Sequence, residues 1–133
     1  MTGATAYLDA SAAVKLVRGE PETAALRSAL AAAQTHVSSE LLGVELRCVA
    51  HREGGGALVD RADRVCSAID LLPCTATIRD RAGQAFDPPQ RALDALHLAT
   101  ALDLGLNTLV LVTYDQRQAA AGRACGLRVV SPS

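Results

Sequence analysis

The sequence is nearly free of aromatic residues. Of its 133 residues, only Tyr7, Phe86 and Tyr114 carry an aromatic ring, and there is no tryptophan. Half of the residues are nevertheless hydrophobic. A substantial core is therefore possible, but it has to be built from alanine, leucine and valine, which suits closely packed helices.

Long apolar runs are also missing. No stretch approaches the roughly 18 uninterrupted apolar residues that a membrane span requires. The N-terminus lacks the charged segment and the following apolar run of a signal peptide. We therefore expect a soluble, cytoplasmic protein without a membrane partner.

The four cysteines show no metal-binding spacing, because none forms a CxxC pair and no histidine pattern lies nearby. This argues against a zinc site. Cys48, Cys66 and Cys125 fall among apolar residues of expected helices. We expect them to be buried free thiols in a reducing compartment.

Neither sign of charge predominates, since 13 basic residues face 14 acidic ones and the net charge is −1. Binding nucleic acid by bulk charge is thereby disfavoured, although a local basic face stays possible. Lys15 is the only lysine, and the other basic residues are arginines. Arginine suits bidentate contact with phosphate, but a GC-rich genome would also explain this usage.

Expected strands and helices alternate along the chain. The predicted strands cover 4–8, 36–38, 71–73, 108–113 and 127–130, and the predicted helices cover 11–18, 22–34, 39–52, 57–71, 75–85, a segment from the Asp87-Pro88-Pro89 break to 104, and 116–125. We expect Ser11 to cap the first of these helices. The alternation predicts an α/β fold with a parallel sheet covered on both faces, in a single domain spanning 1–133.

Two aspartates follow predicted strands. Asp9 comes directly after the first strand, and Asp115 lies two residues after the strand that ends at Thr113. Functional groups of a parallel sheet gather at the carboxyl ends of its strands. Both aspartates should therefore lie at the same edge of the sheet.

Two further carboxylates lie on apolar helices. Glu45 has apolar neighbours one turn away, so it faces inward or into a cleft, whereas Glu40 sits in a first helical turn where a carboxylate complements the helix dipole. Asp94 lies in a helix that is apolar nearly all round, and Asp87 with Gln90 fits a capping box that leaves Asp94 free for another role.

Carboxylates gathered at one edge repel one another and need a cation. Mg²⁺ or Mn²⁺ prefers carboxylate oxygens and water, and acidic clusters holding such ions hydrolyse phosphodiesters. The competing interpretation is a set of unrelated helix caps and surface charges.

Four segments in this order resemble the PIN-domain family, and especially its VapC toxins. They are Tyr7-Leu8-Asp9-Ala10-Ser11-Ala12, Ser38-Ser39 followed by Glu45-Leu46-Arg47, Leu93-Asp94-Ala95-Leu96-His97-Leu98-Ala99, and Thr113-Tyr114-Asp115. The resemblance spans nearly the whole chain. It implies a three-layer α/β/α sandwich around a short central parallel sheet.

The resemblance also implies a function. The chain would be a Mg²⁺- or Mn²⁺-dependent endoribonuclease and the toxin of a toxin–antitoxin pair, hydrolysing RNA with a metal-activated water. The implied catalytic and metal-binding residues are Asp9, Glu45, Asp94 and Asp115, with Ser11 and Thr113 in support and His97 in a packing or supporting role. The implied partners are a VapB-like antitoxin, RNA and a second copy in a homodimer within larger assemblies, with DNA contacted only through the antitoxin.

Three alternatives compete with this interpretation. A phospho-receiver domain needs a lysine after its last strand, and the chain ends at Val129–Ser133 without one. A non-catalytic binding module is disfavoured because all four acids are present. A PIN nuclease of RNA processing, acting without an antitoxin, is disfavoured by the short length.

Overall fold

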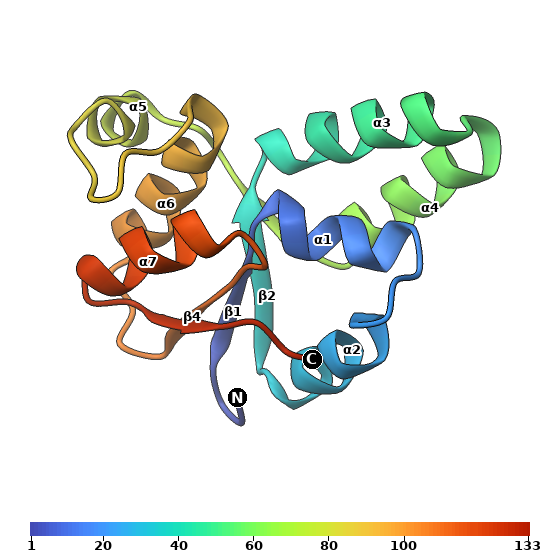
Figure 1. Ribbon diagram of the computed structural model, residues 1–133, viewed down its shortest axis with the longest axis horizontal. Coiled ribbons are helices and arrows are strands. Elements are labelled where there is room, and N and C mark those ends of the chain that lie inside the picture. Colours follow the sequence, from blue (N-terminus) through green and yellow to red (C-terminus); the bar gives the residue numbers. More distant parts are fainter.

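A single parallel sheet runs through the computed structural model, which describes residues 1–133 (Figure 1). Its strands are ordered β3-β2-β1-β4-β5, and all four pairings are parallel. The strands are β1 Thr5–Leu8, β2 Thr35–Ser39, β3 Asp70–Leu72, β4 Leu109–Val112 and β5 Arg128–Val130. The helices are α1 Ala10–Val17, α2 Thr23–Ala32, α3 Leu41–Glu53, α4 Gly56–Ser67, α5 Ala76–Ala82, α6 Ala92–Leu104 and α7 Gln116–Ala124.

Successive side chains of the central strands point to opposite faces of the sheet and pack into two separate hydrophobic cores. Ala6 and Leu8 of β1 pack into one core with α1, α2, α3 and α4, whereas Tyr7 points to the opposite face and packs with Leu98 of α6 and Leu111 of β4. Both faces of the sheet are therefore covered by helices. The predicted three-layer α/β/α sandwich with a parallel sheet is confirmed.

The helix α7 lies unusually close to the sheet. A methyl group added at Gly122 would stand 3.0 Å from Leu111 Cδ2 and 3.3 Å from Val129 Cγ2. The absence of a side chain at this position is what lets the helix approach β4 and β5. In this aromatic-poor protein, a small residue at position 122 thus sets the distance between α7 and the sheet.

Two predicted helix caps are wrong. Asp9, not Ser11, caps α1, since its carboxylate accepts a hydrogen bond from the backbone N–H of Ala12. The helix α6 begins only at Ala92, so Asp87 lies too far upstream to cap it. Asp94 consequently occupies the first turn of α6, where a carboxylate is also favoured by the helix dipole.

The expectation of buried thiols is wrong for two of the three cysteines. Cys48 and Cys125 are exposed and Cys66 is half-buried, because each lies on the outer side of its helix or at its end. All four cysteines are free. None of the helices has the length and apolar character that crossing a membrane requires.

Candidate active site

Asp9 links the end of β1 to the start of α1 and is 2% exposed. Its Oδ1 accepts hydrogen bonds from Ala12 N at 2.9 Å and from Ser11 Oγ at 2.7 Å, while its Oδ2 accepts one from Thr113 Oγ1 at 2.5 Å. Burial raises the pKa of this carboxyl, and the hydroxyl donors oppose that shift. The hydrogen bonds therefore fix the orientation of the carboxylate, while its burial disfavours the ionised form.

Asp115 follows the neighbouring strand β4, three residues after its last residue, Val112. It caps α7, with Gln118 N donating to Asp115 Oδ1 at 3.0 Å. Thr113 Oγ1 accepts a hydrogen bond from Asp115 N at 3.1 Å, and Ser11 Oγ accepts one from Tyr114 N at 2.8 Å. The two hydroxyls predicted to support the site thus connect the segment after β1 to the segment after β4.

Asp94 reaches the same edge from the first turn of α6. The pKa of its carboxyl is raised by burial first, and then by the negative charges of Asp115 and Glu45. No group donates a hydrogen bond to its carboxylate. Its backbone oxygen accepts one from Gln118 Nε2 at 2.8 Å, which ties α6 to α7. Asp94 is therefore a carboxylate that its own protein leaves unpaired.

Glu45 faces the site from α3, with 15% of its side chain exposed. Its Oε1 lies 2.6 Å from Nε2 of His97, and Nδ1 of that histidine lies 2.8 Å from the hydroxyl oxygen of Tyr7. The expectation that His97 packs or supports the site, without acting in catalysis itself, agrees with this buried position behind Glu45.

Glu40 lies outside this group. Its carboxylate accepts a hydrogen bond from the backbone N–H of Cys74, and its own N–H donates to Leu72 O at 2.8 Å. These two contacts attach the start of α3 to the end of β3 and the following loop. The helix phase thus places Glu45 toward the other carboxylates and gives Glu40 a structural connection, as predicted.

Gln118 was not singled out by the sequence analysis. It is completely buried, and Thr113 Oγ1 lies 3.2 Å from its Oε1. A signal was present, since Asp115 and Gln118 have the spacing of a capping box. In the structure, however, the Gln118 amide donates to the backbone of Asp94 and not to the N–H of its own cap.

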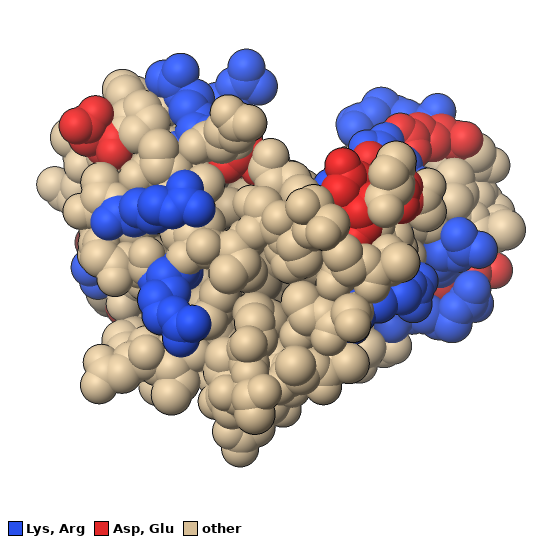
Figure 2. Space-filling model, turned by 60° about the horizontal axis from the view of Figure 1, so that its bottom comes forward, with Lys and Arg blue, Asp and Glu red and all other residues tan.

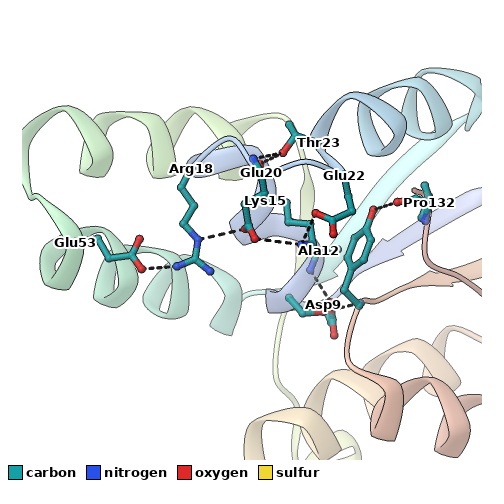
Figure 3. A network of polar contacts seen from close by, with 11 residues as sticks. Asp9, Ala12, Lys15, Arg18, Glu20, Glu22, Thr23, Glu53 and Pro132 are labelled. Atoms are coloured by element: carbon teal, nitrogen blue, oxygen red, sulfur yellow. Dashed lines mark hydrogen bonds and ion pairs between the residues drawn. The ribbon is translucent and has the colours of Figure 1, made fainter.

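No lysine or arginine lies within salt-bridge distance of the four carboxylates. The only lysine, Lys15, pairs with Glu20 at 3.2 Å and Glu22 at 3.1 Å, and its Nζ lies 4.6 Å from the centre of the Tyr114 ring (Figure 3). In the same network, Arg18 bridges Glu20 and Glu53. These two cations are thus engaged elsewhere, and the positive charge of Arg91 acts on Asp94 without forming a salt bridge.

The donor set fits a hard divalent cation in its chemistry. Each of the four carboxylates has at least one oxygen that can still accept a further contact. Carboxylate oxygens are the ligands that Mg²⁺ and Mn²⁺ prefer. The side chains are not gathered at one point, because no three His, Cys, Asp or Glu groups are placed to hold an ion together.

The carboxyl ends of the strands open into a notch. In Figure 1 they lie between α6 on one side and α3 on the other, and Figure 2 shows the surface hollowed between the part built from α5, α6 and α7 and the part built from α3 and α4. The face turned forward in Figure 2 lies on the side of the strands' amino ends, and it carries charged side chains of both signs on its two flanks. At the carboxyl ends, Asp9 is 2% exposed and 15% of the Glu45 side chain is exposed.

A family model described as "PIN domain" matches residues 6–124, which include all four carboxylates. The chain belongs to the PIN-domain family. Ribonuclease VapC46 of Mycobacterium tuberculosis is 39% identical over 130 residues, covering 98% of this chain and 99% of that protein. The predicted resemblance to VapC-type PIN proteins, and thus to ribonucleases of that class, is confirmed.

Solved structures share the fold of this PIN-domain chain. The M. tuberculosis toxin VapC20, described as cleaving the sarcin–ricin loop, superposes with a TM-score of 0.71 at 19% identity, over 88% of this chain and 95% of VapC20. VapBC2 of Rickettsia felis, bound to a DNA fragment from its promoter, gives a TM-score of 0.75 at 13% identity, over 97% of this chain and 99% of that one. At these identities the likeness establishes the architecture alone.

Proposed function

We propose that this PIN-domain protein is a divalent-cation-dependent endoribonuclease and the toxin of a toxin–antitoxin pair in the cytoplasm. One observation carries the catalytic part of the proposal. Asp9, Glu45, Asp94 and Asp115 lie at one edge of the sheet, and no lysine or arginine forms a salt bridge with them. Such a site favours Mg²⁺ or Mn²⁺, held by these four side chains.

The protein's own residues divide the work at this edge. Ser11 and Thr113 orient Asp9, and Thr113 also holds the backbone that carries Asp115. Asp94 and Glu45 supply negative charge from the two walls of the notch. The chemistry that a bound Mg²⁺ or Mn²⁺ supplies is activation of a water and neutralisation of charge on the phosphodiester. RNA is then positioned by its shape and by arginine–phosphate contacts, since stacking platforms are scarce.

The direct test is cleavage of cellular RNA by the purified protein with Mg²⁺ or Mn²⁺ and with a chelator. We expect cleavage that needs the ion and that Asp94→Asn lowers by orders of magnitude. Glu40→Gln is the matched control and should cleave like the wild type, because Glu40 serves the fold. Ion-independent cleavage, or an active Asp94→Asn protein, would contradict the proposal.

The antitoxin part of the proposal rests on the relatives and on a second surface. VapC46 is a named VapC ribonuclease, and VapBC2 was solved as a toxin–antitoxin pair on DNA. A cavity of about 670 Å³ lies between α2 and α4, with an apolar floor that includes Leu30 and Ile69. Arg27, Arg61 and Arg64 line it, and none of them forms a salt bridge. An apolar, acidic segment of a VapB-like antitoxin is complementary to this cavity.

Co-expression with a VapB-like antitoxin, such as one encoded directly upstream, tests this partner. We expect a stable complex that suppresses cleavage, and the double charge reversal Arg27→Glu, Arg64→Glu should weaken it. DNA binding should appear only in the complex, because the chain itself has a net charge of −1. An active nuclease with no partner and no growth arrest on expression would instead favour the RNA-processing alternative.

A homodimer is part of the same proposal. The helix α2 offers it little apolar surface, because its two leucines, Leu26 and Leu30, are buried inside the chain. Among the large exposed apolar side chains, Val44, at 63%, and Leu93, at 47%, are the two most exposed, and each is adjacent in sequence to a site carboxylate. Val44→Glu should shift the protein toward the monomer in size-exclusion chromatography with light scattering, and a wild-type monomer would remove this proposal.

A further inference from the structure

A line of buried polar contacts runs from the core of the sheet to Glu45. It starts at the hydroxyl of Tyr7 on β1, passes through both ring nitrogens of His97 on α6, and ends at Glu45 Oε1 on α3. Tyr7 and His97 are 0% and 1% exposed. Three elements far apart in the sequence thus meet at one histidine, in the interior directly behind the acidic edge.

In the neutral form of the His97 ring, the hydrogens in this line have one consistent direction. A carboxylate can only accept, so Nε2 of His97 carries the hydrogen of its contact with Glu45. Nδ1 of the neutral ring is then an acceptor, and the Tyr7 hydroxyl donates to it. The Tyr7 hydroxyl also lies near the hydroxyls of Ser38 and Thr100, which donate their own hydrogens to backbone oxygens.

The position of His97 excludes contact with substrate. It lies within α6 and the core, while only the carboxylate of Glu45 reaches the notch. Glu45 has three side-chain torsions, and its contact with His97 is its only hydrogen bond. With Oε1 held by the ring, Oε2 is left for the notch. Asp9 is held by three donors in a comparable way, so both ends of the acidic edge have dedicated supports.

We propose that His97, in its Nε2–H form and fixed by Tyr7, is a positioning residue that orients Glu45 toward the cation of the active site. This inference rests on the proposed cation-dependent function. Groups that hydrogen-bond to metal ligands generally affect metal affinity by 10–100-fold, because they fix the ligand's orientation before the ion arrives. The effect should therefore be seen in ion binding as well as in cleavage.

Mn²⁺ titration, followed by the electron paramagnetic resonance of the free ion, tests the proposal without RNA. We expect His97→Leu to bind Mn²⁺ about 10–100-fold more weakly than the wild type, and His97→Gln, which can still donate to Glu45, to recover much of the loss. His51→Leu is the matched control, since His51 is an exposed histidine on the same helix as Glu45. In cleavage assays, His97→Leu should need more Mn²⁺ with an unchanged KM for RNA.

Two results would overturn the positioning role. One is wild-type Mn²⁺ affinity in His97→Leu, and the other is equal weakness of His97→Leu and His97→Gln, which would indicate lost packing. Asp94→Asn in the same titration separates the two proposals. If the wild type binds no Mn²⁺, both proposals fail; if Asp94→Asn loses binding and His97→Leu keeps it, only the positioning role fails.

The nitrogen resonances of the His97 ring provide a test that needs no altered protein to fold. We expect a protonated Nε2 and an accepting Nδ1 in the wild type, and Tyr7→Phe should move the Nδ1 resonance while leaving those of His36 and His51 in place. A neutral ring with its hydrogen on Nδ1 would overturn the proposal, because its Nε2 could not donate to Glu45.

Discussion

Replacing Asp9 by asparagine and by alanine should separate its charge from its hydrogen bonds. In Asp9→Asn, the amide oxygen can still cap α1 and accept from Ser11, and the amide nitrogen can donate to Thr113 Oγ1. Thr113 then turns its hydrogen to Gln118 Oε1, 3.2 Å away. Every buried partner stays satisfied while the charge, which burial disfavours, is gone.

Asp9→Ala removes the same charge and also all three acceptor contacts. The lost cap costs about 1 kcal/mol, while Thr113 can turn its hydrogen to Gln118 Oε1 and Ser11 can donate to Thr113 Oγ1 in this variant too. We therefore expect Asp9→Ala to be about 1 kcal/mol less stable than Asp9→Asn, measured by urea unfolding without metal. Both should lose RNA cleavage by orders of magnitude. Equal stabilities of Asp9→Ala and Asp9→Asn would refute the contribution assigned to the hydrogen bonds of Asp9. RNA cleavage by Asp9→Asn would show that the negative charge of Asp9 is not required for activity.

Further outcomes follow from the acidic edge. Glu45→Gln should abolish RNA cleavage, whereas Glu40→Gln should keep it. The double variant Asp9→Asn, Asp94→Asn should cleave little worse than either single variant, because the effects of residues that act as one unit are not additive. Additive losses of activity in the cleavage assay would contradict this. Millimolar Mn²⁺ should raise the thermal midpoint of the wild type but not of Asp94→Asn, as scanning calorimetry can show. Without metal, the free energy of unfolding should rise as pH falls from neutral to about 4, because the raised pKa values of Asp9 and Asp94 let the folded state bind more protons than the unfolded state. Urea titrations at several pH values can measure this dependence, and Asp94→Asn should make it weaker.

The strands and the acidic edge could be predicted because they depend on strong local patterns. The β-branched run of β4 and the apolar run of β1 each end near an aspartate, and parallel pairing brings those ends together. The position of Glu45 followed from helix phase in the same way. In each case the residues next to the carboxylate in the sequence determine the strand or helix on which it lies and the direction in which it faces.

The details that the sequence missed depend on which of several equivalent groups makes a contact. Asp9 and Ser11 are both good helix caps, and only the path of the chain after β1 selects Asp9. The Tyr7–His97 contact spans 90 residues, and the Gln118 amide chooses the backbone of Asp94 over its own helix end. No local pattern specifies such partners, because they are set by how the layers pack.

The close approach of α7 at Gly122 makes the active site sensitive to a position far from any carboxylate. A single added methyl would crowd the side chains of Leu111 and Val129, so either these side chains or the helix has to move, and the helix carries Asp115 at its start and Gln118 in its first turn. Gly122→Ala therefore changes the fit of α7 on the sheet while every carboxylate of the acidic edge stays in the sequence.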